Sequence, residues 1–298
     1  MSWISVSGAF GAYVVAALVV VALECALDPD DMTSWGWRLA YGSSVVPGIA
    51  VILGRRLLEE TLETAKGKEL EEGSSTGADE EATSPFREIL TNHKAALVVG
   101  FLGTAGIGAL WYVPPVYGVQ LVRESAGLPA RVGTLSEVLV FLVPTLLSPA
   151  AGLLVDSWGA GRVHLVTLFL GCLAAPPPLF CWWMRAPSAM SLYLGQGALG
   201  LLLALTSSVY LWTVELFPAR VRVTGVSLAY NLGIGVFGGL GPLVCDASAR
   251  LIGARGALSA PSLYVVFVGL ISLTTVVVSR VMAHKGAVKL AHLRARPY

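Results

Sequence analysis

The sequence predicts an all-α polytopic membrane protein with about eight transmembrane helices, and three observations lead to this fold class. Apolar residues make up 55% of the 298-residue chain and charged residues only 13%, which is far from the balance of soluble domains. The apolar residues gather in long uncharged runs near the roughly 20 residues that a helix needs to cross a bilayer. These runs lack the alternation of a barrel strand and exceed its length, so helices are expected.

Eight runs are candidates for the spans. In chain order they cover residues 4–23, 39–54, 95–122, 132–155, 163–184, 189–214, 223–245 and 260–279. The second run is short, but Trp35, Trp37 and Tyr41 suit an interfacial aromatic belt beside it, and Arg38 can extend to the interface. No basic residue precedes the first run and no small-residue cleavage pattern closes it, so a signal peptide is not expected.

The basic residues predict the orientation of these spans. With both termini on one side, that side holds fourteen Lys and Arg residues and the opposite side six. The positive-inside rule therefore places the termini, the loop 59–94 and the basic tail 284–298 in the cytoplasm. The net charge of +1 gives no reason to expect a nucleic-acid partner.

One segment looks soluble. Residues 59–85, "EETLETAKGKELEEGSSTGADEEATSP", have almost no apolar side chain and predict a largely disordered cytoplasmic loop, with a phosphorylated regulatory loop as the alternative. The four cysteines have unrelated spacings, so neither a disulfide framework, a metal site nor a cofactor is expected. No nucleophile–base pair or phosphate loop points to an enzyme.

Two short cytoplasmic turns combine an acid at a helix end with arginine just beyond it. They are "GLLVDSWGAGR" at residues 152–162 and "VELFPARVRVTG" at residues 214–225. One interpretation is topology plus helix capping. The other is a pair of latches, in which Glu215 or Asp156 pairs with an arginine of the neighbouring turn when the cytoplasmic side is closed.

Polar residues at membrane depth are costly and are therefore candidates for function. Glu137 lies inside the fourth run and is a candidate for a cation or proton site, or an interfacial carboxylate that reaches water. Tyr230 and Asn231 lie inside the seventh run and Gln196 inside the sixth, where they contact solute or join neighbouring helices.

An aromatic, proline-containing stretch lies in the third run. In "WYVPPVYG", Pro114 and Pro115 remove two amide donors and are predicted to break the helix, as happens where backbone lines a transport cavity. Tyr112 and Tyr117 beside them are candidates for binding a quaternary ammonium such as betaine. An interfacial aromatic belt beside a kink is the alternative interpretation.

These motifs resemble a known family. Gly152, Asp156, Gly159 and Arg162 are similar to the cytoplasmic signature of the major facilitator superfamily, although Ser157, Ala160 and Gly161 stand where that signature usually has basic residues. More specifically, "ELFPARVRVTGVSLAYNLGIGVFGG", "GWRLAYG", "RRLLEET" and "FREILTNHKAALVV" resemble the metabolite:proton symporter group that includes proline/betaine transporters. The resemblance covers about residues 35–279.

The resemblance implies a domain organisation. The superfamily has twelve helices in two bundles, and this chain would supply helices five to twelve: residues 1–58 the last two helices of the first bundle, 59–94 the interbundle loop and 95–283 the second bundle. Solute would bind between the bundles.

The resemblance also implies a function: secondary transport of small organic solutes such as proline, betaine or organic acids by alternating access. A proton or sodium gradient would drive it across the lipid bilayer of the plasma membrane. Asp156, Arg162, Glu215, Arg220 and Arg222 would form the gate. The alternative is an N-terminally truncated, non-transporting fragment, or an accessory or sensor protein of the same fold.

Overall fold

The computed structural model describes residues 2–55, 84–252 and 254–284. The predicted disorder of residues 59–83 and the basic tail beyond residue 284 lie outside these ranges. The chain divides into two compact units, one formed by Met1–Leu18 with Pro85–Tyr298 and the other by Val19–Ser84. Each unit is described by itself.

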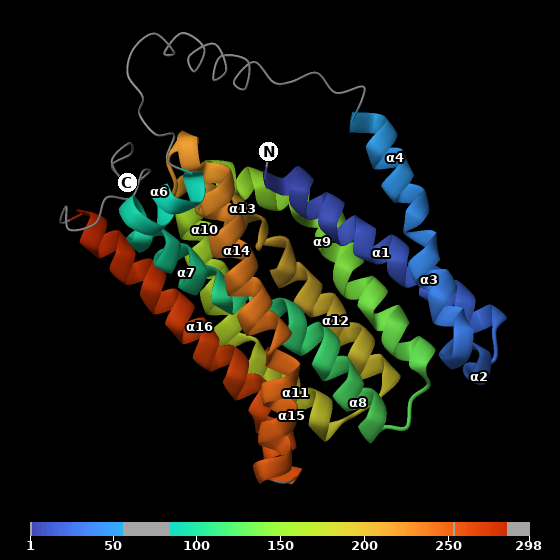
Figure 1. Ribbon diagram of the computed structural model, residues 1–298. Coiled ribbons are helices and arrows are strands. Elements are labelled where there is room, and N and C mark those ends of the chain that lie inside the picture. Colours follow the sequence, from blue (N-terminus) through green and yellow to red (C-terminus); the bar gives the residue numbers. More distant parts are fainter. Residues whose placement is uncertain (1, 56–83, 253, 285–298) are drawn as a thin grey trace. The chain divides into compact units, whose positions relative to one another are not determined.

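The described residues are helical and contain no strand (Figure 1). Eight helical stretches within them are long and apolar enough to cross a membrane, and each overlaps one predicted run. They are Val6–Ala26, Pro29–Gly54, Lys94–Ser125, Ala130–Trp158, Ala160–Arg185, Ala189–Glu215, Ala219–Leu251 and Ala260–Met282. The prediction of an all-α polytopic fold is therefore confirmed.

The larger unit takes in the first part of α1 (Ser2–Ala26) and every helix from residue 85 onward. These are α6 (Pro85–Asn92), α7 (Lys94–Tyr112), η2 (Val113–Gly118), α8 (Val119–Ser125), α9 (Ala130–Trp158), α10 (Ala160–Thr167), η3 (Leu168–Ala174), α11 (Pro176–Arg185), α12 (Ala189–Ala204), α13 (Ser207–Glu215), η4 (Ala219–Val221), α14 (Arg222–Gly239), α15 (Gly241–Ile252) and α16 (Ala254–His284). The smaller unit holds the rest of α1, α2 (Pro29–Asp31), η1 (Met32–Gly36), α3 (Trp37–Ser43) and α4 (Val45–Arg55).

The span Lys94–Ser125, which begins with α7, is the best buried of the described spans. Helix α7 packs along α14 on one side and α16 on the other, while α9 packs along α12 (Figure 1). Glycine permits the closest approach: a methyl group on Gly108 would lie 2.8 Å from the Cα of Ile234, and one on Gly238 would lie 2.9 Å from the Gly108 carbonyl oxygen. Small residues allow such close backbone contact between membrane helices.

The third span continues through its two prolines without interruption. The predicted break at Pro114 and Pro115 is instead a π-helical segment, η2, between α7 and α8, so the span continues from Lys94 to Ser125. The Gln196 side-chain amide of α12 donates to the Pro115 carbonyl of this segment at 3.4 Å, so the buried glutamine joins α12 to the third span.

Orientation can be tested at two turns of the larger unit. Ser157, before the α9–α10 turn, and Ala186, between α11 and α12, are both exposed. In a variant whose exposed Cys25 and Cys181 are replaced, Ala186→Cys should react with an impermeant maleimide in intact cells. Ser157→Cys should react only after permeabilisation, because the positive-inside rule places it in the cytoplasm. The reverse labelling pattern would refute the predicted orientation.

Candidate functional site

Aromatic rings from five helices form one continuous cluster in the larger unit. Each ring in it contacts the next, and in order of contact the six residues of this aromatic cluster are Tyr13, Phe141, Phe10, Trp111, Tyr230 and Tyr210. The rings come from α1, α9, α7, α14 and α13, so residues almost 220 positions apart in the chain meet in one place.

Trp111 is at the middle of the aromatic cluster. Its ring meets Phe10 edge-on at a centroid distance of 5.6 Å and Tyr230 edge-on at 6.4 Å. Phe10 in turn stacks on Phe141 at 5.7 Å, and Phe141 stacks on Tyr13 at 4.9 Å. These separations are the ones that favourable aromatic pairs adopt. Near Phe10, the Ser7 hydroxyl donates to the Thr145 carbonyl at 2.9 Å and fixes α1 against α9.

The far end of the cluster carries polar groups. Tyr210 and Tyr230 share a hydroxyl–hydroxyl hydrogen bond of 2.7 Å with ring centroids 5.1 Å apart. The structure places Tyr230, which the sequence singled out, in this cluster. Tyr112, another residue that the sequence singled out, follows Trp111 at the end of α7, and its ring lies close to Gly238 of α14. The structure adds Tyr210, which the sequence reasoning missed because a lone tyrosine near a helix end gives no periodic signal.

The lysines and arginines of the described spans in the larger unit lie near the span ends and not in this cluster. Within the described spans of the larger unit, each lysine and arginine lies no more than three residues from an end of its span. This is the distribution expected of interfacial anchors that extend toward water. The aromatic cluster therefore presents ring faces and hydroxyls, without a guanidinium or ammonium group of its own.

Three other predicted residues lie apart from the cluster contacts. Tyr117, in η2, is half-buried against the apolar core. The Asn231 amide donates to the Ser227 carbonyl of its own helix at 2.8 Å and is exposed, so in this structure it joins no neighbouring helix. Glu137 is half-buried on α9, seven residues after that helix begins.

At the α13–α14 turn, an arginine pairs with an acid that the sequence reasoning did not single out. Arg220 forms an ion pair with Glu88 of α6, with 3.5 Å between the Nε and carboxylate oxygen atoms. The Arg222 Nε donates to the Phe217 carbonyl at 3.3 Å, which closes the turn on itself. At the other turn, Gly159 adopts a φ of 87° between α9 and α10, a conformation that favours glycine. Asp156 and Arg162 on either side of it are exposed.

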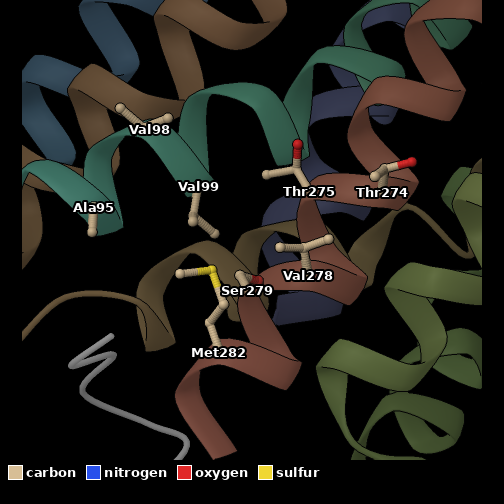
Figure 2. Close-up of a pocket in the computed structure, with 8 residues that line it drawn as sticks. All are labelled: Ala95, Val98, Val99, Thr274, Thr275, Val278, Ser279 and Met282. Carbon is tan, nitrogen blue, oxygen red and sulfur yellow. The ribbon is translucent and has the colours of Figure 1, made fainter. Parts of the chain in front are cut away.

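A groove between α7 and α16 lies elsewhere on the unit (Figure 2). It encloses about 360 Å³, and its wall consists of Ala95, Val98, Val99, Thr274, Thr275, Val278, Ser279 and Met282. The hydroxyls of Thr275 and Ser279 donate to carbonyls of their own helix. Such a wall is apolar and lacks groups that orient a polar solute, so the aromatic cluster is the better solute-binding candidate.

The spans and their composition define an integral, multi-pass α-helical membrane protein, as predicted. Comparison with known proteins identifies its relatives. The chain is 30% identical over 266 residues to the citrate-proton symporter of Klebsiella pneumoniae, covering 88% of this chain and 56% of the relative. It is 27% identical to the alpha-ketoglutarate permease of Escherichia coli, covering 93% and 60%, and 24% identical to the proline/betaine transporter of Escherichia coli, covering 95% and 56%.

These matches confirm the resemblance: the chain is a homologue of metabolite:proton symporters of the major facilitator superfamily. The relatives are named as symporters, permeases and transporters, which confirms the prediction that the protein is not an enzyme. The chain spans little more than half the length of these curated relatives. No family model and no solved structure matches it.

Proposed function

We propose that the protein is a proton-coupled symporter in the plasma membrane that works by alternating access, and that its solutes are small zwitterions such as betaine and proline. The observation that carries the choice of solute is the aromatic cluster. Aromatic faces attract quaternary and secondary ammonium groups through the negative potential above the ring. Tyr112, half-exposed beside the cluster, and Tyr230 within it are the proposed solute-binding residues that the sequence also predicted.

Organic acids are the competing solutes, because relatives are named for citrate and alpha-ketoglutarate. A polyanion at membrane depth needs arginine or lysine to compensate its charge. The basic residues of the described spans in the larger unit lie near the span ends, away from the cluster. The cluster therefore favours a solute whose charges cancel within the molecule.

The coupling ion in this proposal is the proton, because relatives are named proton symporters. Glu137 is its proposed binding residue, since a half-buried carboxylate within a span can gain and lose a proton as its exposure changes. Asp156, Arg162, Glu215, Arg220 and Arg222 are the proposed cytoplasmic gate, and sodium coupling is the alternative that the measurement below separates.

Uptake of labelled betaine, proline and citrate into transporter-deficient cells tests the proposal. Betaine and proline should accumulate, citrate should not, and a protonophore should abolish accumulation while removal of sodium should not. Glu137→Gln should leave downhill exchange intact and abolish accumulation. Tyr230→Ala should lower uptake about tenfold at low solute concentration, since stacking on the cluster is lost. The matched control is Tyr41→Ala, an exposed tyrosine of the smaller unit. Citrate accumulation without betaine uptake would refute the choice of solute.

A further inference from the structure

We infer that the indole N–H of Trp111 binds the carboxylate of the zwitterionic solute and so distinguishes betaine-like solutes from simple cations. This inference rests on the proposed function and assigns the anionic half of the same site. The observation behind it is a buried donor at the centre of the aromatic cluster: among the described residues, the Trp111 Nε1 atom has no hydrogen-bond partner.

A buried donor without an acceptor is unfavourable, and such groups are rare in native structures. The ring of Trp111 meets Phe10 and Tyr230 edge-on. Phe10 is a hydrocarbon ring without an acceptor atom, and the Tyr230 hydroxyl is hydrogen-bonded to Tyr210. A solute carboxylate would supply an acceptor, through a charge-assisted bond stronger than a bond between neutral groups.

A second donor accompanies Trp111. Tyr210 and Tyr230 share one hydrogen bond at 2.7 Å, and two hydroxyl groups have two protons. One of these protons makes the hydrogen bond between the two hydroxyls. The other proton is not used in that bond and can be donated to a solute. The rings that carry these indole and phenol donors both contact Tyr230 or belong to it. A zwitterion has an ammonium group, which ring faces attract, and a carboxylate, which neutral donors can bind. The cluster offers both kinds of group.

The arrangement also explains selectivity against polyanions. Neutral donors stabilise one carboxylate but cannot neutralise three, and the cationic side chains of the larger unit's described spans lie near the span ends. The indole N–H therefore favours betaine over choline, which has no carboxylate, without favouring citrate.

The test compares Trp111→Phe with the wild-type protein in equilibrium binding of labelled betaine and choline in lipid nanodiscs. Phenylalanine keeps an aromatic ring and removes the N–H, so the dissociation constant for betaine should rise at least tenfold while that for choline changes less than about twofold. Trp182→Phe, an exposed tryptophan of α11 outside the cluster, is the matched control and should change neither. Thermal unfolding in the same nanodiscs checks that each variant is folded.

If Trp111→Phe does not fold, a benzothienyl analogue placed at position 111 by amber suppression keeps the bicyclic shape and replaces only the N–H by sulfur, and the same selective loss of betaine is expected. Equal weakening of betaine and choline, or no change in either, would overturn the inference and leave the proposed function standing. Absence of betaine and proline binding by the folded wild-type protein would overturn both.

Discussion

Gly108→Ala is expected to destabilise the larger unit strongly. The added methyl group would lie 2.8 Å from the Cα and 2.9 Å from the carbonyl oxygen of Ile234. Both are backbone atoms of α14, so no flexible side chain can turn away. Overpacking of this kind costs about 1 to 3 kcal/mol, and more where two helix backbones must separate. Heating the protein in detergent with a thiol-reactive dye, in a background whose exposed Cys25 and Cys181 are replaced, measures the effect, because unfolding exposes the buried Cys172 and Cys245.

The matched controls are two glycines of α14, the helix that packs against Gly108 of α7. A methyl group on Gly235 or Gly239 would meet no atom within 4 Å among the described residues. Alanine is favoured over glycine inside a helix by about 1 kcal/mol, so Gly235→Ala and Gly239→Ala should unfold at the same or a slightly higher temperature. If all three variants unfold alike, the glycines soften the helix generally and the close crossing of α7 and α14 is not what they serve.

This contrast between glycines could not be predicted from the sequence. The seventh run holds many glycines, and their positions in the sequence do not say which of them face a neighbouring helix. Gly233 and Gly238 face α7, whereas Gly235 and Gly239 face open space. The rotation of α14 about its own axis decides which of its glycines face α7. That rotation depends on packing across the whole unit.

The spans were predictable because their signal is local. A run of apolar residues is read from composition, and the eight predicted runs all overlap described spans. The aromatic cluster was only partly predictable, since the sequence singled out Tyr230 as a polar residue inside its span and Tyr112, which follows Trp111, beside two prolines. Phe10, Tyr13 and Phe141 resemble ordinary apolar residues of a span until tertiary packing brings their rings together.

The same limit applies at the cytoplasmic turns. The sequence paired acids and arginines that lie in the two signature motifs, because motif spacing was the available signal. Glu88 precedes the third span and belongs to neither motif, yet its carboxylate meets Arg220. Which carboxylate controls the gate therefore has to be decided by measurement.

Glu215→Gln is expected to open the cytoplasmic side, and Glu88→Gln is not. Glu215 is the half-buried last residue of α13 and makes interactions there, and a charge-assisted hydrogen bond is worth about 1.5 to 3 kcal/mol. Its loss should shift the ratio of open to closed gates by roughly tenfold to a hundredfold. The Arg220 side chain that pairs with Glu88 is 73% exposed, and exposed pairs contribute about 0 to 1 kcal/mol.

Cysteine labelling separates the two carboxylates. Asn231→Cys provides an exposed reporter on α14, two helical turns beyond the cytoplasmic turn. In inside-out vesicles, a membrane-impermeant maleimide should label this cysteine at least about tenfold faster in the Glu215→Gln background than in the wild-type background, with Glu88→Gln close to wild type. Labelling from the outer side should slow in parallel, since one gate state replaces the other. Equal labelling rates in all three backgrounds at matched expression would show that the acid and the two arginines of this turn set topology alone. A selective effect of Glu88→Gln would instead make the ion pair between α6 and the α13–α14 turn the element that closes the gate.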